Sequence, residues 1–262
     1  MYVFSVCGDD AAALAEQLAA RLGSDARVAT ISRVDALPVD DRPTGVTTAY
    51  TLAESGWTGA GDDSLDHLID RLAATHDYAI VHGDPGVRLP QVVCGDVSHA
   101  GDVLYRVADA ASADIAAIVD AIGELEPYET LESLVAQVKA SDKAELSGAI
   151  ATFTGRVRAK ESADDAPTEY LQFEKYEGVA EERMATISRE LEAREGVLSV
   201  VMHHRTGVIE YGEDIVFVVV LAAHRGEAFE TVEDGINRLK DEVPLFKKEV
   251  TVDEEFWVHE RQ

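Results

Sequence analysis

The sequence predicts an α/β protein of two domains, a doubly wound parallel sheet in residues 1–125 and an α+β domain in residues 126–262. In the first half, apolar strand-like runs alternate with segments of helical period, which is typical of a parallel sheet covered by helices. The chain has 262 residues, enough for two domains of ordinary size. Composition also changes along the chain, because only eight of its 23 basic residues lie before residue 141.

The first half opens with a predicted buried strand over residues 2–7, a turn at Gly8-Asp9-Asp10 and a helix over 11–22. The later elements follow in order: strands over 27–31 and 46–51, a helix over 64–74, strands over 77–81 and 103–107, and an alanine-rich helix over 114–122. We expect the strands to form one parallel sheet.

The first turn stands where nucleotide-binding folds place a phosphate loop, because helix N-terminal amides attract anions. The segment CGDDAAALAEQL lacks the pattern GxxxxGK[ST], and Asp9 and Asp10 would repel phosphate. The order of elements, with Asp84 near the end of a later strand, resembles the molybdopterin-guanine dinucleotide biosynthesis adaptor family over about residues 1–110. The resemblance implies a nucleotide-binding fold whose phosphate loop is degenerate, so the domain would serve as a scaffold.

Charge excludes some classes of partner. The chain carries 50 acidic and 23 basic residues, a formal charge of -27, so it would repel nucleic acid and anionic membranes. The acids are dispersed rather than gathered in a tail. This predicts a halophilic acidic surface, and hence greater stability in molar KCl than in low salt; an ordinary acidic cytosolic protein is the alternative.

Cysteine usage and the N-terminus predict a cytoplasmic protein. Cys7 and Cys94 are too few for a disulfide framework and do not form a CxxC pair. The first residues lack a positive signal region, and no apolar run reaches the roughly 18 residues of a membrane helix. His76, His82 and His99 match no metal-ligand spacing, so we expect no metal site.

The second half begins after an acidic joint at 123–128. Its predicted elements are a helix over 131–138, a strand from 149 that Gly155 interrupts, strands over 168–176, 197–204, 207–211 and 215–221, and a helix over 178–195. We expect the polar segment ESADDAP at 161–167 to be mobile and able to cover a site. Another helix follows the last strand and ends at Pro244; its apolar face is predicted to carry Phe229, Val232, Ile236, Leu239 and Val243.

Five ordered motifs lie in this half: GAIATFTGRVR at 148–158, HHRTG at 203–207, AHR at 223–225 followed by Ala228-Phe229, LKDEVPLFKKE at 239–249 and WVHER at 257–261. Together they resemble the large, catalytic subunit of molybdopterin synthase over about 135 residues. The resemblance implies an α/β hammerhead fold, a homodimer and a ubiquitin-like small subunit with a C-terminal Gly-Gly tail. That tail would end in a thiocarboxylate, and two such sulfurs would convert cyclic pyranopterin monophosphate into the molybdopterin dithiolene, without a metal or organic cofactor.

The same resemblance implies the site residues. Lys240 and Lys247 match the two functional lysines of the family, Lys240 toward the thiocarboxylate and Lys247 toward the pterin as acid or base. The phosphate and pterin contacts fall to Arg158, His224 and Arg225, which suits a phosphorylated substrate on an acidic chain. Phe153 would be pocket wall or core. Arg261 matches a tail arginine that reaches the neighbouring subunit's site.

Each assignment has an alternative. Taken alone, Lys240 stands beside Asp241 and Glu242 and would be interpreted as a solvent-exposed helix lysine. Arg156 would be interpreted as forming ion pairs with surface acids. His203 and His204 are expected to be strand residues whose rings bond to the backbone. For the whole chain, the competing hypotheses are a non-catalytic module that binds ubiquitin-like tails and a guanine-nucleotide adaptor built on the first domain. If mutation of the lysines abolishes activity, the chain is not a non-catalytic tail-binding module. If GTP does not raise the melting temperature, the chain is not a guanine-nucleotide adaptor.

Overall fold

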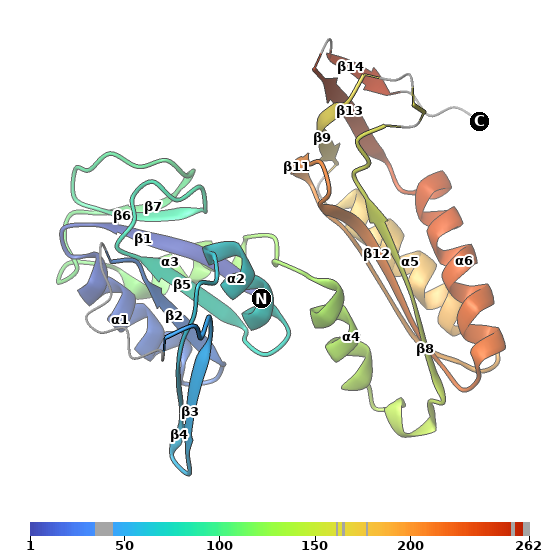
Figure 1. Cartoon of the computed structure of the whole chain (residues 1–262), viewed down its shortest axis with the longest axis horizontal. Coiled ribbons are helices and arrows are strands. Elements are labelled where there is room, and N and C mark those ends of the chain that lie inside the picture. The colour runs from blue at the N-terminus through green and yellow to red at the C-terminus, as the bar shows by residue number, and fades with distance from the viewer. Residues whose placement is uncertain (35–43, 161, 164–165, 177, 253–254, 259–262) are drawn as a thin grey trace. The chain divides into compact units, whose positions relative to one another are not determined.

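The computed structural model describes residues 1–34, 44–160, 162–163, 166–176, 178–252 and 255–258. The chain forms two compact units, Met1–Thr130 and Leu131–Gln262, so the division lies five residues after the boundary expected at 125 (Figure 1). Parts of the segment expected to be mobile, residues 161 and 164–165, lie outside the described residues, as does Arg261. No helix of the described residues is both long enough and apolar enough to cross a membrane.

A five-stranded parallel sheet forms the centre of the first unit. Its order is β2-β5-β1-β6-β7, with bounds Val28–Ser32, Tyr78–His82, Tyr2–Gly8, Gln91–Cys94 and Val103–Val107. Alternate residues of β1 point to opposite faces, so Phe4 packs with α1 (Ala11–Leu22) and α3 (Ile115–Gly123), while Val3 packs with α2 (Leu65–Ala73). Helices therefore cover both faces of a parallel sheet, as the alternating pattern predicted.

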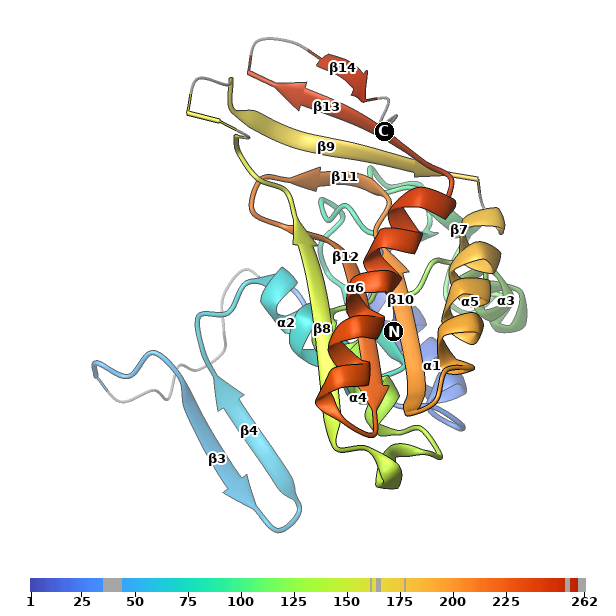
Figure 2. The same cartoon turned by 90° about the vertical axis from the view of Figure 1, so that its right-hand side faces the viewer.

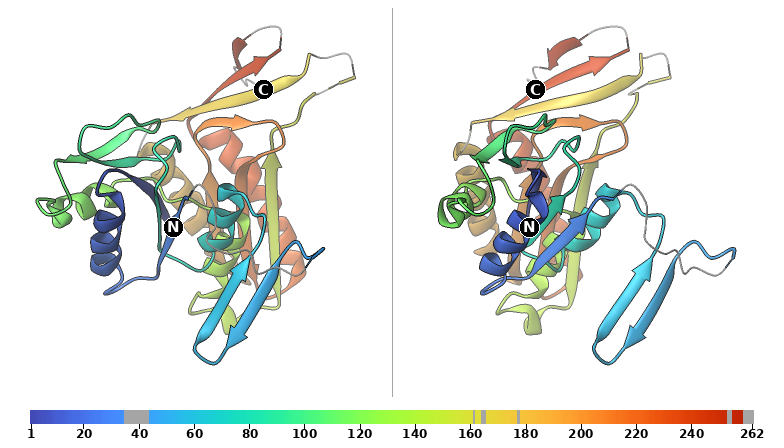
Figure 3. Two further views of the ribbon diagram at one scale, coloured as in Figure 1. Left: turned by 60° about the vertical axis from the view of Figure 1, so that its left-hand side comes forward. Right: turned by 90° about the vertical axis from the view of Figure 1, so that its left-hand side faces the viewer.

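The strand expected over 46–51 does not belong to that sheet. The observed strand β3 (Ala49–Ala53) pairs only with β4 (Gly56–Ala60) in a separate antiparallel hairpin, which Figure 3 shows standing away from the five strands. Gly56, the first residue of β4 after the turn, has a φ of 142°, a backbone conformation that favours glycine. The prediction was wrong here because a strand pattern does not identify the pairing partner. Strand β6 has only four residues and was not predicted from the sequence.

An antiparallel three-stranded sheet, β10-β12-β8, lies at the centre of the second unit. Its strands are Val197–His204, Asp214–Ala222 and Ala149–Arg156. Helices α5 (Val179–Glu192) and α6 (Arg225–Glu242) cover one face, and α4 (Leu131–Lys139) covers the other, as Figure 2 shows. Alternating residues of β12 explain both contacts, since Val218 and Val220 face α5 and α6 while Phe217 and Val219 face α4.

A second antiparallel sheet completes this unit, in the order β11-β9-β13-β14. The strands are Gly207–Glu210, Thr168–Lys175, Leu245–Thr251 and Glu255–Val258. A single 3-10 turn, Ala144–Leu146, precedes β8. The unit is thus α+β, with β13 leaving the C-terminal end of α6 after Pro244.

Two details of the second unit differ from expectation. Gly155 does not end β8, which continues to Arg156, but the pairing of β8 with β12 shifts register directly after Gly155, between Val216 and Asp214. Phe229 is 65% exposed, although its spacing placed it on the buried face of the helix. Ile236 and Leu239 are buried as predicted. The other buried positions of α6 are the small residues Ala228, Thr231 and Gly235, which allow α6 to approach the sheet closely and turn Phe229 outward.

Candidate functional site

A cavity of about 740 Å³ lies within the second unit, between its two sheets and the C-terminal end of α6. Its volume is within the range of small-molecule sites. Strands β8, β9, β10, β12 and β13 contribute to the wall together with α6. The apolar part of the lining consists of Phe153, Leu171, Phe173, Ile215, Val216, Ile236, Leu239, Val243, Leu245 and Phe246.

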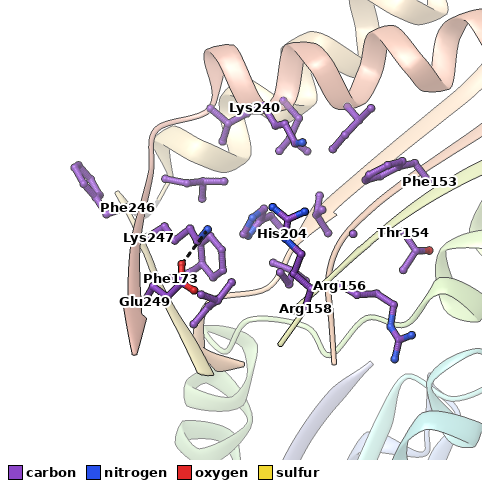
Figure 4. Close-up of a pocket in the computed structure, with 18 of the residues that line it drawn as sticks. Phe153, Thr154, Arg156, Arg158, Phe173, His204, Lys240, Phe246, Lys247 and Glu249 are labelled. Carbon is purple, nitrogen blue, oxygen red and sulfur yellow. Dashed lines mark ion pairs between the residues drawn. The ribbon is translucent and has the colours of Figure 1, made fainter. Parts of the chain in front are cut away.

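Cationic side chains from three segments meet at this cavity. Lys240 lies in the last turn of α6, Lys247 on β13, and Arg158 just beyond β8. In Figure 4 all three point toward the same space. The bend at Val243-Pro244 makes this possible, since it ends the helix that carries Lys240 and changes the chain direction into the strand that carries Lys247. Lys160 also lines the cavity, so an anionic ligand would meet several positive charges.

Lys247 has an acidic neighbour on its own strand. Its Nζ lies 3.8 Å from Oε2 of Glu249, and Oε1 of the same carboxylate accepts a hydrogen bond from the Thr168 hydroxyl. Side-chain exposure is 25% for Lys247 and 20% for Glu249, so both are accessible from the cavity but largely covered. The dashed line in Figure 4 marks this ion pair.

Arg156 lines the cavity but is directed away from the lysines in Figure 4. Its Nε is 3.1 Å from Oδ1 of Asp214, and its guanidinium also donates to the carbonyl oxygen of Gly212. These contacts hold the side chain on the outer surface. The prediction that Arg156 pairs with surface acids is confirmed.

His204 is a buried residue at the end of β10 and forms part of the cavity wall. Its Nδ1 is 2.8 Å from the carbonyl oxygen of Arg205, which can only accept, so Nδ1 carries the proton. The ring lies edge-on to Phe173, with centroids 4.7 Å apart. The expected backbone bond is therefore present. His203 stacks on Phe217, with centroids 6.5 Å apart.

The structure brings four of the seven candidate site residues to one cavity: Phe153, Arg158, Lys240 and Lys247. His224 and Arg225 are not among them. They are the N-cap and first residue of α6, whereas Lys240 is near its last residue. At 1.5 Å per helical residue, Arg225 and Lys240 are separated by about 22 Å along the helix axis. Both His224 and Arg225 are exposed. Arg261 lies outside the described residues.

Sequence reasoning missed Lys160, Thr168 and Glu249 as cavity residues. A signal existed for Glu249, because it stands two positions after Lys247 and alternate strand residues share a face. None existed for Thr168, whose contact with Glu249 depends on the pairing of β9 with β13. Among the described residues, no group of three or more His, Cys, Asp or Glu side chains could hold a metal ion.

The arrangement suits an anionic, partly apolar ligand that reacts with proton transfer. Arginine and lysine can bind phosphate or carboxylate groups, the aromatic wall can pack against a ring, and the two lysines can donate or accept protons.

Comparison with known proteins adds independent information. A protein-family model described as MoaE protein matches residues 124–242. A Haloferax volcanii protein named probable molybdopterin synthase is 55% identical over 264 residues, covering 100% of both chains. The molybdopterin synthase catalytic subunit of Bacillus subtilis is 39% identical over 46% of this chain and 75% of its own. A crystal structure of molybdopterin synthase from Staphylococcus aureus is similar at 30% identity and a TM-score of 0.45, covering 52% of this chain and 94% of that one.

Proposed function

The chain belongs to the molybdopterin synthase catalytic subunit family, and from this membership we propose that its cavity is the place of sulfur transfer to cyclic pyranopterin monophosphate. Family membership makes it an enzyme of molybdenum cofactor biosynthesis. The proposed sulfur donor is the thiocarboxylated Gly-Gly tail of a ubiquitin-like small subunit, and the proposed product is the molybdopterin dithiolene.

The observation that carries this proposal is the meeting of Lys240 and Lys247 at one cavity together with Arg158. The two lysines come from a helix and the strand that follows it, joined by the bend at Pro244. Only 23 basic residues occur in a chain of net charge -27, so a cavity with several cations is a specific feature of this surface. Both reactants are anions, and the cavity supplies the positive charge that they need.

We propose different roles for the two lysines, and their positions support this. Lys240 lies at the C-terminal end of α6, on the exposed side of the cavity, where an entering tail with a thiocarboxylate would meet it. Lys247 is more covered and neighbours the aromatic wall at Phe173, so it is the better candidate for proton transfer at the pterin. Arg158 would bind the phosphate. No metal or organic cofactor is part of the proposed reaction.

We further propose that the active form is a homodimer. His224, Arg225 and the exposed Phe229 lie toward the N-terminal end of α6, and none of them lines the cavity that holds Lys247. In a symmetric dimer, this end of α6 would supply His224 and Arg225 to the partner's cavity, and Phe229 would be covered. Arg261 is assigned the same role of reaching the neighbouring site.

The remaining proposals concern architecture and setting. Residues 126–262 are proposed to form the α/β hammerhead of the family, and residues 1–125 a scaffold derived from a nucleotide-binding fold. The scaffold assignment is supported by the acidic start of α1, where Asp10 accepts a hydrogen bond from the Ala110 amide. The protein is proposed to act in the cytoplasm, where its substrates would be made.

The test is a single-turnover assay with cyclic pyranopterin monophosphate and a thiocarboxylated small subunit. The wild-type chain should form the dithiolene, and Lys240→Ala and Lys247→Ala should each reduce the rate by at least about 10²-fold. Lys139→Ala is a matched control, because Lys139 ends α4 outside the cavity lining, and it should react at the wild-type rate. Full activity in either cavity variant would contradict the proposal and favour a tail-binding module.

A further inference from the structure

Glu249 is an acidic residue in a cavity whose other described charged residues are cationic and suit anionic ligands. Of the described residues that line the cavity, it alone carries a carboxylate, whereas Arg156, Arg158, Lys160, Lys240 and Lys247 are cationic. A carboxylate here repels a phosphate or a thiocarboxylate and weakens their binding. Its presence therefore calls for a role that substrate attraction does not explain.

The strand geometry directs this carboxylate at one lysine. Lys247 and Glu249 are two residues apart on β13, so their side chains leave the same face of the strand and both reach the cavity. On the neighbouring strand β9 they pair with Phe173 and Leu171, which are buried and form the wall beneath them. Lys240 comes from α6, and its acidic neighbours there, Asp241 and Glu242, are not among the residues that line the cavity.

The Thr168 hydroxyl restrains the carboxylate. Thr168 is the first residue of β9 and only 7% exposed, and its Oγ1 donates to Oε1 of Glu249. The other oxygen, Oε2, stands 3.8 Å from the Lys247 Nζ, longer than the roughly 2.8 Å of a charge-assisted hydrogen bond. The ammonium is thus attracted and oriented, but its protons are not fully taken up by Glu249.

We propose that Glu249, held by Thr168, is a positioning residue for Lys247 in the reaction assigned to this cavity. It keeps the ammonium group directed into the cavity before substrate arrives, and the anionic substrate then competes with Glu249 for the same ammonium. The inference rests on the proposed function for its kinetic consequence. The orientation of Lys247 can be measured without any turnover.

The direct test is ¹⁵N relaxation of the lysine ammonium groups at mildly acidic pH. The chain has seven lysines, and the Lys247 signal can be assigned from its loss in Lys247→Arg. In Glu249→Gln and Thr168→Val the order parameter of Lys247 should fall while that of Lys139 is unchanged, and Thr168→Ser, which retains the hydroxyl, should restore it. An unchanged Lys247 order parameter in Glu249→Gln would overturn the inference, whether or not the chain turns over substrate.

The kinetic test separates positioning from a structural role. Glu249→Gln should lower the single-turnover rate by about 10²-fold, as expected for a misplaced catalytic group, and leave substrate binding unchanged or tighter because a repelling charge is gone. The double variant Lys247→Ala/Glu249→Gln should be no slower than Lys247→Ala. If the double variant is slower than Lys247→Ala by the factor that Glu249→Gln alone causes, the two residues act independently and the proposal is overturned. Glu233→Gln, an exposed glutamate of α6, is the matched control.

If the wild-type chain forms no dithiolene, the proposed function fails, and the relaxation experiment still decides whether Glu249 orients Lys247.

Discussion

At the scale of single residues, Gly155 forms a tight point in the cavity wall. A Cβ added there would lie 2.6 Å from Cγ1 of Val216 and 3.4 Å from the Phe153 ring. Val216 is buried and β-branched, so its side chain has little rotamer freedom to move aside. We expect Gly155→Ala to lower the free energy of unfolding by about 1–3 kcal/mol, the usual cost of overpacking. Urea denaturation followed by circular dichroism measures this.

The control for this prediction is Gly123→Ala. Gly123 ends α3 and has no atom within 4 Å of its added Cβ, so alanine should leave stability unchanged or raise it by up to about 1 kcal/mol through helix propensity. Equal stability of Gly155→Ala and wild type would show that β8 can shift away from β12 at this position.

Site residues divide into those that local sequence can reveal and those that need the fold. Lys240 and Lys247 stand in one motif with Pro244 between them, and resemblance was enough to select them. In the sequence, Glu249 differs from the other acidic residues of this acidic chain only in its position two residues after Lys247. Its significance depends on the hydroxyl of Thr168, 81 residues away in sequence, which only the β9–β13 pairing places beside it.

At the scale of elements, an ion-pair cluster joins α5 to α6. Arg238 of α6 donates from Nε to Glu242 at 2.7 Å and from its guanidinium to Glu190 of α5. Glu242 also pairs with Arg183 of α5. The hydrogen bond from Arg238 is the main cause that holds the pKa of Glu242 below its ordinary value, with Arg183 adding to it.

This cluster predicts a pH-dependent contribution to stability. Because the folded-state pKa of Glu242 is depressed, its contribution is present above the pKa of an unfolded glutamate, about 4.3, and is lost as pH falls through the folded value. Glu242→Gln should therefore lower the urea midpoint at pH 7, and the difference from wild type should narrow toward pH 3. Glu233→Gln on the same helix should show no such trend. A constant difference across this range would mean that the charge of Glu242 contributes nothing.

Most helices and strands could be predicted from the sequence, but the pairing of the strands and the packing of the helices could not. Periodicity identified β1, β5 and β7 with their helices, because a buried strand and an amphipathic helix each have a local signature. It could not show that β3 pairs with β4 rather than with the parallel sheet. Periodicity also could not predict which of two adjacent residues of α6, Ala228 or Phe229, faces the sheet. Close packing against the sheet favours the smaller residue, so Ala228 is buried and Phe229 is exposed.

At the scale of the whole molecule, the two ends of α6 raise the question of which chain completes each site. The cavity holds Lys240 and Lys247, while His224 and Arg225 are exposed at the far end of the same helix. A sequence motif cannot distinguish a contact within one chain from a contact across a symmetric interface, because the same residues take part in both cases. The separation along α6 in the structure supports the second possibility.

Subunit complementation tests this directly. Arg225→Ala and Lys247→Ala should each be inactive alone, but after joint refolding a heterodimer would contain one cavity with its own Lys247 and the partner's Arg225. Random pairing makes half of the dimers heterodimers with one of two sites complete, so activity should recover to about a quarter of wild type. A mixture of Lys240→Ala and Lys247→Ala is the control and should stay inactive, because both lysines line the same chain's cavity. If native mass spectrometry shows heterodimers of the first pair without recovered activity, Arg225 does not serve the partner's site.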